Sequence, residues 1–119
     1  MDRQEMESRT KRLSIRIIRL CGALPQNSVG WAISNQLVRS GTSVGANYRA
    51  SGRARSDAEF LAKLGIVEEE ADETCYWLEV IIESELIKAS LVEPLLDEAN
   101  EIVAMIVTMR KSIKERISR

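Results

Sequence analysis

The chain has 119 residues, with 17 Lys/Arg, 18 Asp/Glu and no histidine, and its net charge at pH 7 is −1. This length supports one domain over residues 1–119, built around one hydrophobic core. The absence of histidine excludes Ser-His and Cys-His catalytic pairs, histidine-ligated zinc and the Glu-x-x-His di-iron motif. An all-carboxylate magnesium or manganese site stays chemically possible, but no spacing indicates one. We therefore expect a protein that is not an enzyme and needs no metal or cofactor.

The two cysteines, Cys21 and Cys75, lie far apart in apolar helical contexts and form no CxxC motif. This pattern is typical of a reduced, cytoplasmic protein. The N-terminal residues lack the apolar centre of a signal peptide, and no segment approaches the roughly 18 apolar residues that a membrane span needs. We expect no membrane partner.

The first predicted helix runs from about Glu7 to Leu24, because apolar residues recur every three or four positions. Its seam consists of Leu13, Ile17, Leu20 and Leu24, and we expect Ile15 and Ile18 to widen it. Gly22 and then Pro25 end the helix.

The second helix is expected to begin at Asn27 or Ser28, either of which can cap it. Its seam is unusually small and polar, which lets another helix approach closely. Tight packing within the chain is the favoured explanation, and an oligomer interface is the alternative. The seam passes through Ile33, Leu37, Ser40, Val44, Asn47 and Ser51, with Gly41, Ser43, Gly45, Ala46 and Ala50 around it.

Two S-x-x-E capping boxes predict the starts of the remaining helices. Ser56 with Glu59 opens a third helix that reaches about Ser84, and Ser90 with Glu93 opens the fourth. Pro94 is expected within or before the first turn of that helix. The third seam consists of Phe60, Leu64, Val67, Ala71, Thr74, Leu78 and Ile81, and the fourth of Val92, Leu95, Ala99, Ile102, Ile106, Met109 and Ile113.

Short connections between long helices favour antiparallel neighbours. The pattern as a whole therefore predicts an all-α protein, an antiparallel up-down-up-down four-helix bundle.

Charge is distributed unevenly along the chain. Residues 1–56 contain ten Lys/Arg and three Asp/Glu, residues 57–109 contain two and fourteen, and residues 110–119 contain five and one. In an antiparallel bundle the cations gather at one end, which we call the basic pole, and the turn between the third and fourth helices gives an acidic end. Cations in a last helical turn also complement the helix dipole, so part of the pattern is ordinary helix chemistry. The basic pole comprises Arg3, Arg9, Lys11, Arg12, Arg49, Arg53, Arg55, Arg110, Lys111, Lys114, Arg116 and Arg119.

Four segments carry a resemblance to a known family. They are LVRSGTSVGANY (37–48), RARS (53–56), EF (59–60) and ADETCYWLE (71–79). They resemble the bacterial four-helix-bundle proteins related to those encoded in intervening sequences of large-subunit ribosomal RNA genes. The chain is also similar to the accessory protein of diversity-generating retroelements, which is associated with nucleic acid and reverse transcriptase.

The resemblance implies a left-handed antiparallel bundle that assembles as a ring-like homopentamer. An extra apolar stripe at Trp31, Val38 and Trp77 also favours an oligomer. The family pattern usually has a glutamate where this chain has Ala50, which leaves Arg53 with one fewer candidate partner.

The leading functional hypothesis is a non-enzymatic oligomer that binds RNA or DNA through the basic pole. The alternative is a scaffold module that docks a protein partner through its charged ends.

Four polar residues that match the family, Asn47, Ser56, Glu59 and Glu73, are expected to serve in capping and core hydrogen bonds. Glu73 is also expected to pair with Asn47 or an arginine of the second helix. The expected phosphate ligands are Arg49, Arg53, Arg55, Arg110, Lys111, Lys114 and Arg116.

Overall fold

The computed structural model describes residues 2–119, which form four α-helices and no strands. The helices are α1 (Arg3–Cys21), α2 (Ser28–Ser51), α3 (Asp57–Glu83) and α4 (Ala89–Ile117). The prediction of an all-α, four-helix protein is confirmed.

Side-chain caps fix where three of the helices begin. Each cap residue has an extended backbone, and its side chain accepts a hydrogen bond from an N–H in the first turn. The pairs are Asp2 with Glu5 N at 2.8 Å, Asn27 with Gly30 N at 3.0 Å and Ser56 with Glu59 N at 3.1 Å. Asp2 starts α1 one turn before the predicted Glu7, and the helix ends at Cys21 rather than Leu24.

The fourth helix begins differently from the prediction. Lys88 is its N-cap and makes no side-chain capping hydrogen bond, so Ser90 lies inside the helix and does not cap it. Pro94 is the sixth residue of α4, beyond the first turn where it was expected. Because proline has no N–H, the helix forgoes the hydrogen bond that would run from position 94 to the Ser90 carbonyl.

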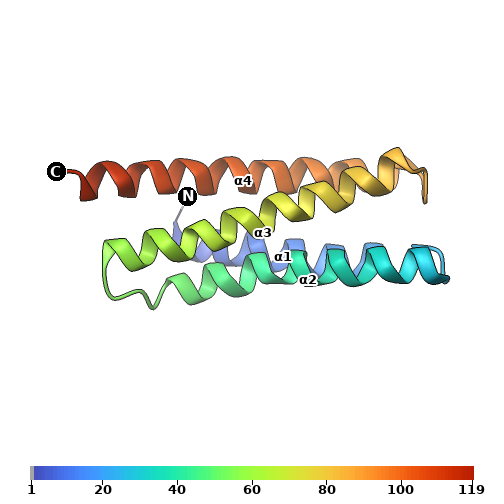
Figure 1. Ribbon diagram of the computed structural model, residues 1–119, viewed down its shortest axis with the longest axis horizontal. Coiled ribbons are helices and arrows are strands. Elements are labelled where there is room, and N and C mark those ends of the chain that lie inside the picture. The colour runs from blue at the N-terminus through green and yellow to red at the C-terminus, as the bar shows by residue number, and fades with distance from the viewer. Residues whose placement is uncertain (1) are drawn as a thin grey trace.

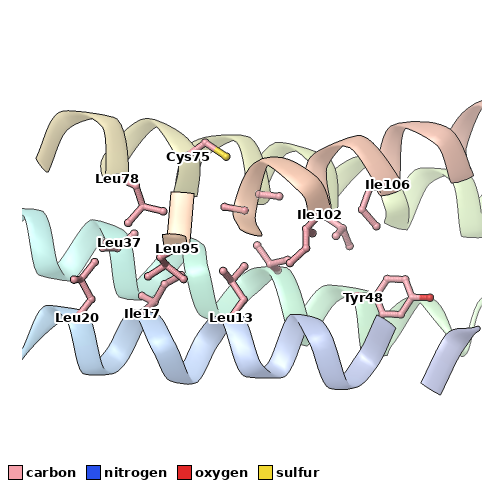
Figure 2. Packing of buried hydrophobic residues seen from close by; sticks show 14 of the residues in the cluster. Leu13, Ile17, Leu20, Leu37, Tyr48, Cys75, Leu78, Leu95, Ile102 and Ile106 are labelled. Atoms are coloured by element: carbon pink, nitrogen blue, oxygen red, sulfur yellow. The ribbon is translucent and has the colours of Figure 1, made fainter. Parts of the chain in front are cut away.

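The core lies along the middle of the bundle, where one apolar seam of each helix is buried. Figure 2 shows Leu13 and Ile17 of α1, Leu37 of α2, Leu78 of α3 and Ile102 of α4 directed into the same interior. The predicted seams are therefore the buried ones, with Ile33, Asn47, Phe60 and Met109 only partly covered. Ile15 and Ile18 do not widen the seam of α1, because their side chains are 42% and 54% exposed.

Small residues of α2 bring α1 close within the same chain. A Cβ at Gly41 would lie 2.3 Å from Ile17 Cδ1, and one at Gly45 would lie 3.2 Å from the Thr10 carbonyl oxygen. The Ser14 hydroxyl also donates to the Gly41 carbonyl at 3.1 Å. This part of the small-residue seam thus serves intramolecular packing.

The molecule is a rod of 51 × 21 × 20 Å. The C-terminus and the α2–α3 connection lie at one end of it, with the start of α1 set back from that end, and the α1–α2 and α3–α4 connections lie at the other (Figure 1). Helix α1 contacts α2 and α4, and α3 also contacts α2 and α4. No helix among residues 2–119 is long and apolar enough to cross a membrane.

Candidate nucleic-acid interface

The basic pole is formed by the part of the rod that holds the C-terminus and the α2–α3 connection. The start of α1, the end of α2 and the end of α4 all lie toward that end (Figure 1). Arg49 lies in the last turn of α2, and Lys114 and Arg116 in the last turn of α4, where cations complement the partial negative charge of helix C-termini. The fold therefore brings together cationic residues that are far apart in the chain, from Arg3 to Arg116.

Five of the seven predicted phosphate ligands are exposed at this end, and they come from α2, its C-terminal connection and α4. Among residues 2–119, no carboxylate lies within ion-pair distance of any of the five. Their charges are therefore available to an external anion. These free cations are Arg49, Arg53, Arg55, Lys111 and Lys114.

The other two predicted ligands are engaged with carboxylates of α3. Arg116 donates from Nε and Nη2 to both oxygens of Asp57, at 3.0 and 2.9 Å. Arg110 donates from Nη1 to Glu68 at 2.9 Å and is largely covered, packing over Gly65. Arg110 Nε is buried and has no hydrogen-bond partner among the described residues. A phosphate would have to compete with an acidic side chain for either arginine.

Arg3 was part of the predicted basic pole but not among its predicted ligands, and its role is structural. Its guanidinium lies over the Tyr48 ring, with Cζ 4.6 Å from the centroid, and 5.7 Å from the centroid of Phe60. Nη2 donates to Ser51 Oγ at 3.0 Å. A Cβ at Gly52 would lie 2.8 Å from Arg3 Nη1, so a side chain at this position would displace the end of Arg3. Arg3 thereby ties α1 to the segment that carries Arg53 and Arg55.

Arg9 is not a free cation either, because it pairs with carboxylates of α4. Nε and Nη2 lie 2.6 and 2.7 Å from the two carboxylate oxygens of Glu98, and Nη2 also contacts Glu101. The hydrogen bond from Arg9 lowers the pKa of Glu98 below its usual value, and the same bond raises the pKa of Arg9. Periodicity could not identify this pair, because its members are separated by most of the chain.

The four polar residues matched to the family make local contacts. Ser56 caps α3, and the Glu59 carboxylate accepts from the Arg55 backbone N–H at 3.4 Å. Asn47 donates to the Ser43 carbonyl one turn earlier in α2 and does not contact Glu73. Glu73 accepts instead from Arg39.

Arg39, Glu70, Glu73 and Trp77 form a network between α2 and α3. Arg39 donates to both glutamates, and Trp77 Nε1 donates to Glu73 at 3.1 Å. The hydrogen bonds from Arg39 and Trp77 lower the pKa of Glu73. The network holds the carboxylates of Glu70 and Glu73 as ion-pair partners of Arg39. Residues 2–119 contain no cluster of three or more His, Cys, Asp or Glu arranged to hold a metal ion.

A hollow of about 510 Å³ lies between α1 and α2 near the basic pole. Lys11 and Arg49 reach it from the two helices, and Glu7 adds a negative charge. Its walls are mostly polar or small, so it suits a hydrated, charged group rather than an apolar ligand. The lining residues are Gln4, Glu7, Ser8, Lys11, Ser14, Gly45, Ala46 and Arg49.

The four helices and the basic pole define a small all-α bundle with a cationic end. Residues 3–108 match the model of the 23S rRNA-intervening sequence protein family. The chain belongs to that family, as its resemblance predicted.

A solved structure supports the same assignment. The chain is 35% identical to a protein of unknown function from the S23 ribosomal protein family of Bacteroides thetaiotaomicron, whose crystal structure gives a TM-score of 0.83. The match covers 89% of this chain and 98% of that one. No curated protein matches the chain.

Proposed function

We propose that this protein is a non-enzymatic, cytoplasmic homo-oligomer that binds RNA or DNA through the basic pole. The observation that carries the proposal is the group of free cations, Arg49, Arg53, Arg55, Lys111 and Lys114, gathered from two helix ends. A near-neutral chain that concentrates positive charge at one end can still attract a polyanion. The two free cysteines are in keeping with a reducing compartment.

Contacts at this end would be made to phosphate rather than to bases. Lysine and arginine bind phosphate oxygens without reading sequence, and their binding releases condensed counterions. The aromatic residues nearest to the basic pole, Tyr48 and Phe60, are covered by Arg3 and cannot serve as stacking platforms. Binding should therefore depend steeply on salt and weakly on sequence. The family description supports ribosomal RNA as the first probe.

The proposed assembly is an antiparallel up-down-up-down bundle that forms a ring-like homopentamer. The placement of the α2–α3 connection at one end, and of the α1–α2 and α3–α4 connections at the other, supports the order of the helices (Figure 1). Trp31 supports an oligomer, because its side chain is 56% exposed in the single chain. The other members of the expected apolar stripe, Val38 and Trp77, are partly covered within the chain.

Fluorescence anisotropy with labelled single-stranded RNA and DNA tests nucleic-acid binding. The variant Arg53→Gln/Arg55→Gln should bind all sequences more weakly, and the slope of log K against log salt should fall by about one for each phosphate that is no longer neutralised. Lys88→Gln removes a cation from the opposite end of the rod and should leave the slope unchanged. If the parent, assembled as shown by light scattering, binds neither polymer at low salt, the nucleic-acid proposal is wrong.

A second candidate function is docking of a protein partner at the acidic end. Exposed apolar side chains near that end favour it, namely Val29, Trp31 and Leu91, and the same end carries the exposed carboxylates Glu85 and Glu93. A mixed apolar and acidic surface suits a basic protein partner. This candidate survives if the anisotropy experiment gives no binding.

A further inference from the structure

The outer face of α1 carries a strip of cations around two isoleucines, which we call the basic strip. It comprises Lys11, Arg12, Ile15, Ile18 and Arg19, all exposed. Among residues 2–119, no carboxylate lies within ion-pair distance of its three cations. The strip is therefore an apolar centre with uncompensated positive charge on both sides of it.

The outer face of α3 carries the opposite pattern, which we call the acidic strip. It comprises Glu69, Asp72, Tyr76, Glu79 and Glu83, all exposed and none in an ion pair with another described residue. Tyr76 is 57% exposed and stands edge-on to the half-buried Trp77, with ring centroids 5.0 Å apart. This strip is an aromatic centre with uncompensated negative charge on both sides of it.

The two strips cannot neutralise each other within one molecule. Helices α1 and α3 each adjoin α2 and α4, but their backbones do not approach one another, so they occupy opposite corners of the bundle. The seam of each helix points into the shared core, so the exposed strips point away from each other. Each strip needs a partner from outside the chain.

The strips match in spacing as well as in charge. Lys11 and Arg19 lie one turn before and one turn after Ile15, about 6 Å along the helix at a rise of about 1.5 Å per residue. Asp72 and Glu79 lie similarly about 5–6 Å on either side of Tyr76. When Tyr76 packs against Ile15 and Ile18, the cations of the basic strip therefore lie opposite the carboxylates of the acidic strip.

We infer that the partner of each strip is a second copy of this chain, whose acidic strip on α3 packs against the basic strip on α1. The inference rests on the homo-oligomer of the proposed function and names the surface that builds it. Because the two strips differ, the contact is heterologous and cannot make an isologous two-fold dimer. It generates a ring when the rotation closes and a filament when it does not.

Charge inversion of one strip at a time tests the contact, with mass measured by light scattering after size exclusion and helicity by circular dichroism. Lys11→Glu/Arg12→Glu/Arg19→Glu inverts the basic strip, and Glu69→Lys/Asp72→Lys/Glu79→Lys inverts the acidic strip. Each variant alone should give a helical particle of 13.4 kDa, because like charges then face each other. The chain with both strips inverted should recover the mass of the parent, since every contact is complementary again.

Glu93→Lys/Glu115→Lys is the matched control, because it inverts exposed carboxylates of α4 outside both strips and should keep the mass of the parent. If an inverted variant loses helicity, the neutral variant Glu69→Gln/Asp72→Asn/Glu79→Gln replaces it and should raise the dissociation constant of the oligomer at least about tenfold. A neutral variant that dissociates like the parent contradicts the contact.

Two outcomes overturn the inference in different ways. If the parent is an oligomer and either inverted variant keeps its mass, the surface is wrong while the proposed oligomer stands. If the parent is itself a 13.4 kDa particle at micromolar concentration, the homo-oligomer of the proposed function fails together with this contact. Nucleic-acid binding is measured separately and decided by its own experiment.

Discussion

The hydroxyls of Ser40 in α2 and Thr74 in α3 lie 3.1 Å apart, and both residues are fully buried in the core. Each hydroxyl also has a carbonyl acceptor on its own helix, Leu37 for Ser40 at 3.3 Å and Glu70 for Thr74 at 2.8 Å. Every polar atom of this pair is therefore satisfied, which is the condition under which a polar contact can lie in an apolar core.

A double-mutant cycle measures what this contact contributes. Ser40→Ala and Thr74→Val each remove one hydroxyl, and each should lower the free energy of unfolding by about 1 kcal/mol. Because they remove the same hydrogen bond, the double variant should be destabilised by less than the sum, with a coupling of about 0.5–1.5 kcal/mol. Denaturant unfolding followed by circular dichroism gives all four values. Additive effects would show that the two hydroxyls act independently.

Two glycines should respond in opposite ways to alanine. A Cβ at Gly30 would lie 1.7 Å from the Pro25 carbonyl oxygen, which is backbone and cannot move without disturbing the α1–α2 connection. Gly30→Ala should therefore destabilise the protein by at least about 2 kcal/mol. At Gly65 the nearest atom is the end of the Arg110 side chain at 3.4 Å, so Gly65→Ala should be neutral or stabilise by up to about 1 kcal/mol. Equal melting temperatures for the two variants would contradict this expectation.

Acid should weaken the bundle partly through Glu98. Arg9 holds the pKa of Glu98 below its ordinary value of 4.5 in the folded protein, whereas the unfolded chain binds that proton at the ordinary pKa. The stabilisation is thus present above pH 4.5 and is lost as the pH falls through the lower, folded value. Unfolding of the parent and of Arg9→Gln between pH 3 and 7 checks this. The variant should lose less stability over the acidic part of the range, and Glu98→Gln should behave in the same way.

Both thiols should react slowly in the folded protein. Burial raises the pKa of Cys75 to about 11, with smaller contributions from Asp72 and Glu79, and burial also raises the pKa of Cys21. Since the thiolate is the reactive form, an aromatic disulfide reagent at pH 8 should label Cys21, which is less buried, before Cys75. Denaturant should make both react quickly. Fast labelling of Cys75 without denaturant would mean that α3 opens readily.

The helices and their buried seams could be predicted because both depend on residues three or four positions apart. Ser56 with Glu59 is such a local signal, and α3 begins where that signal placed it. The same motif was misleading at Ser90, since the N-cap of α4 is Lys88, two residues earlier, and it makes no side-chain capping hydrogen bond. A capping motif shows that a residue is able to cap a helix, but the packing of the surrounding residues determines whether it does so.

The basic pole was less predictable because its free charge depends on partners across helices. Arg110 and Arg116 have the same sequence context as Lys111 and Lys114, yet α3 presents Glu68 and Asp57 to the two arginines. Those pairings depend on how α3 and α4 are rotated against each other, which periodicity does not specify. The prediction that Ile15 and Ile18 join the core was wrong for a related reason. The spacing of apolar residues predicts which face of a helix is buried, but it does not predict how wide the buried face is.

The contact between Arg9 and Glu98 joins α1, the first of the four helices to be synthesised, to α4, the last of the four. A nascent chain can bring α1, α2 and α3 together one after another through short connections, but α1 packs against α2 alone until α4 has been synthesised. Until then, the flank of α1 that α4 will cover stays open, with apolar residues such as Leu20 at its edge. Closure of the bundle therefore waits for α4, and until that step an incomplete chain is exposed to aggregation.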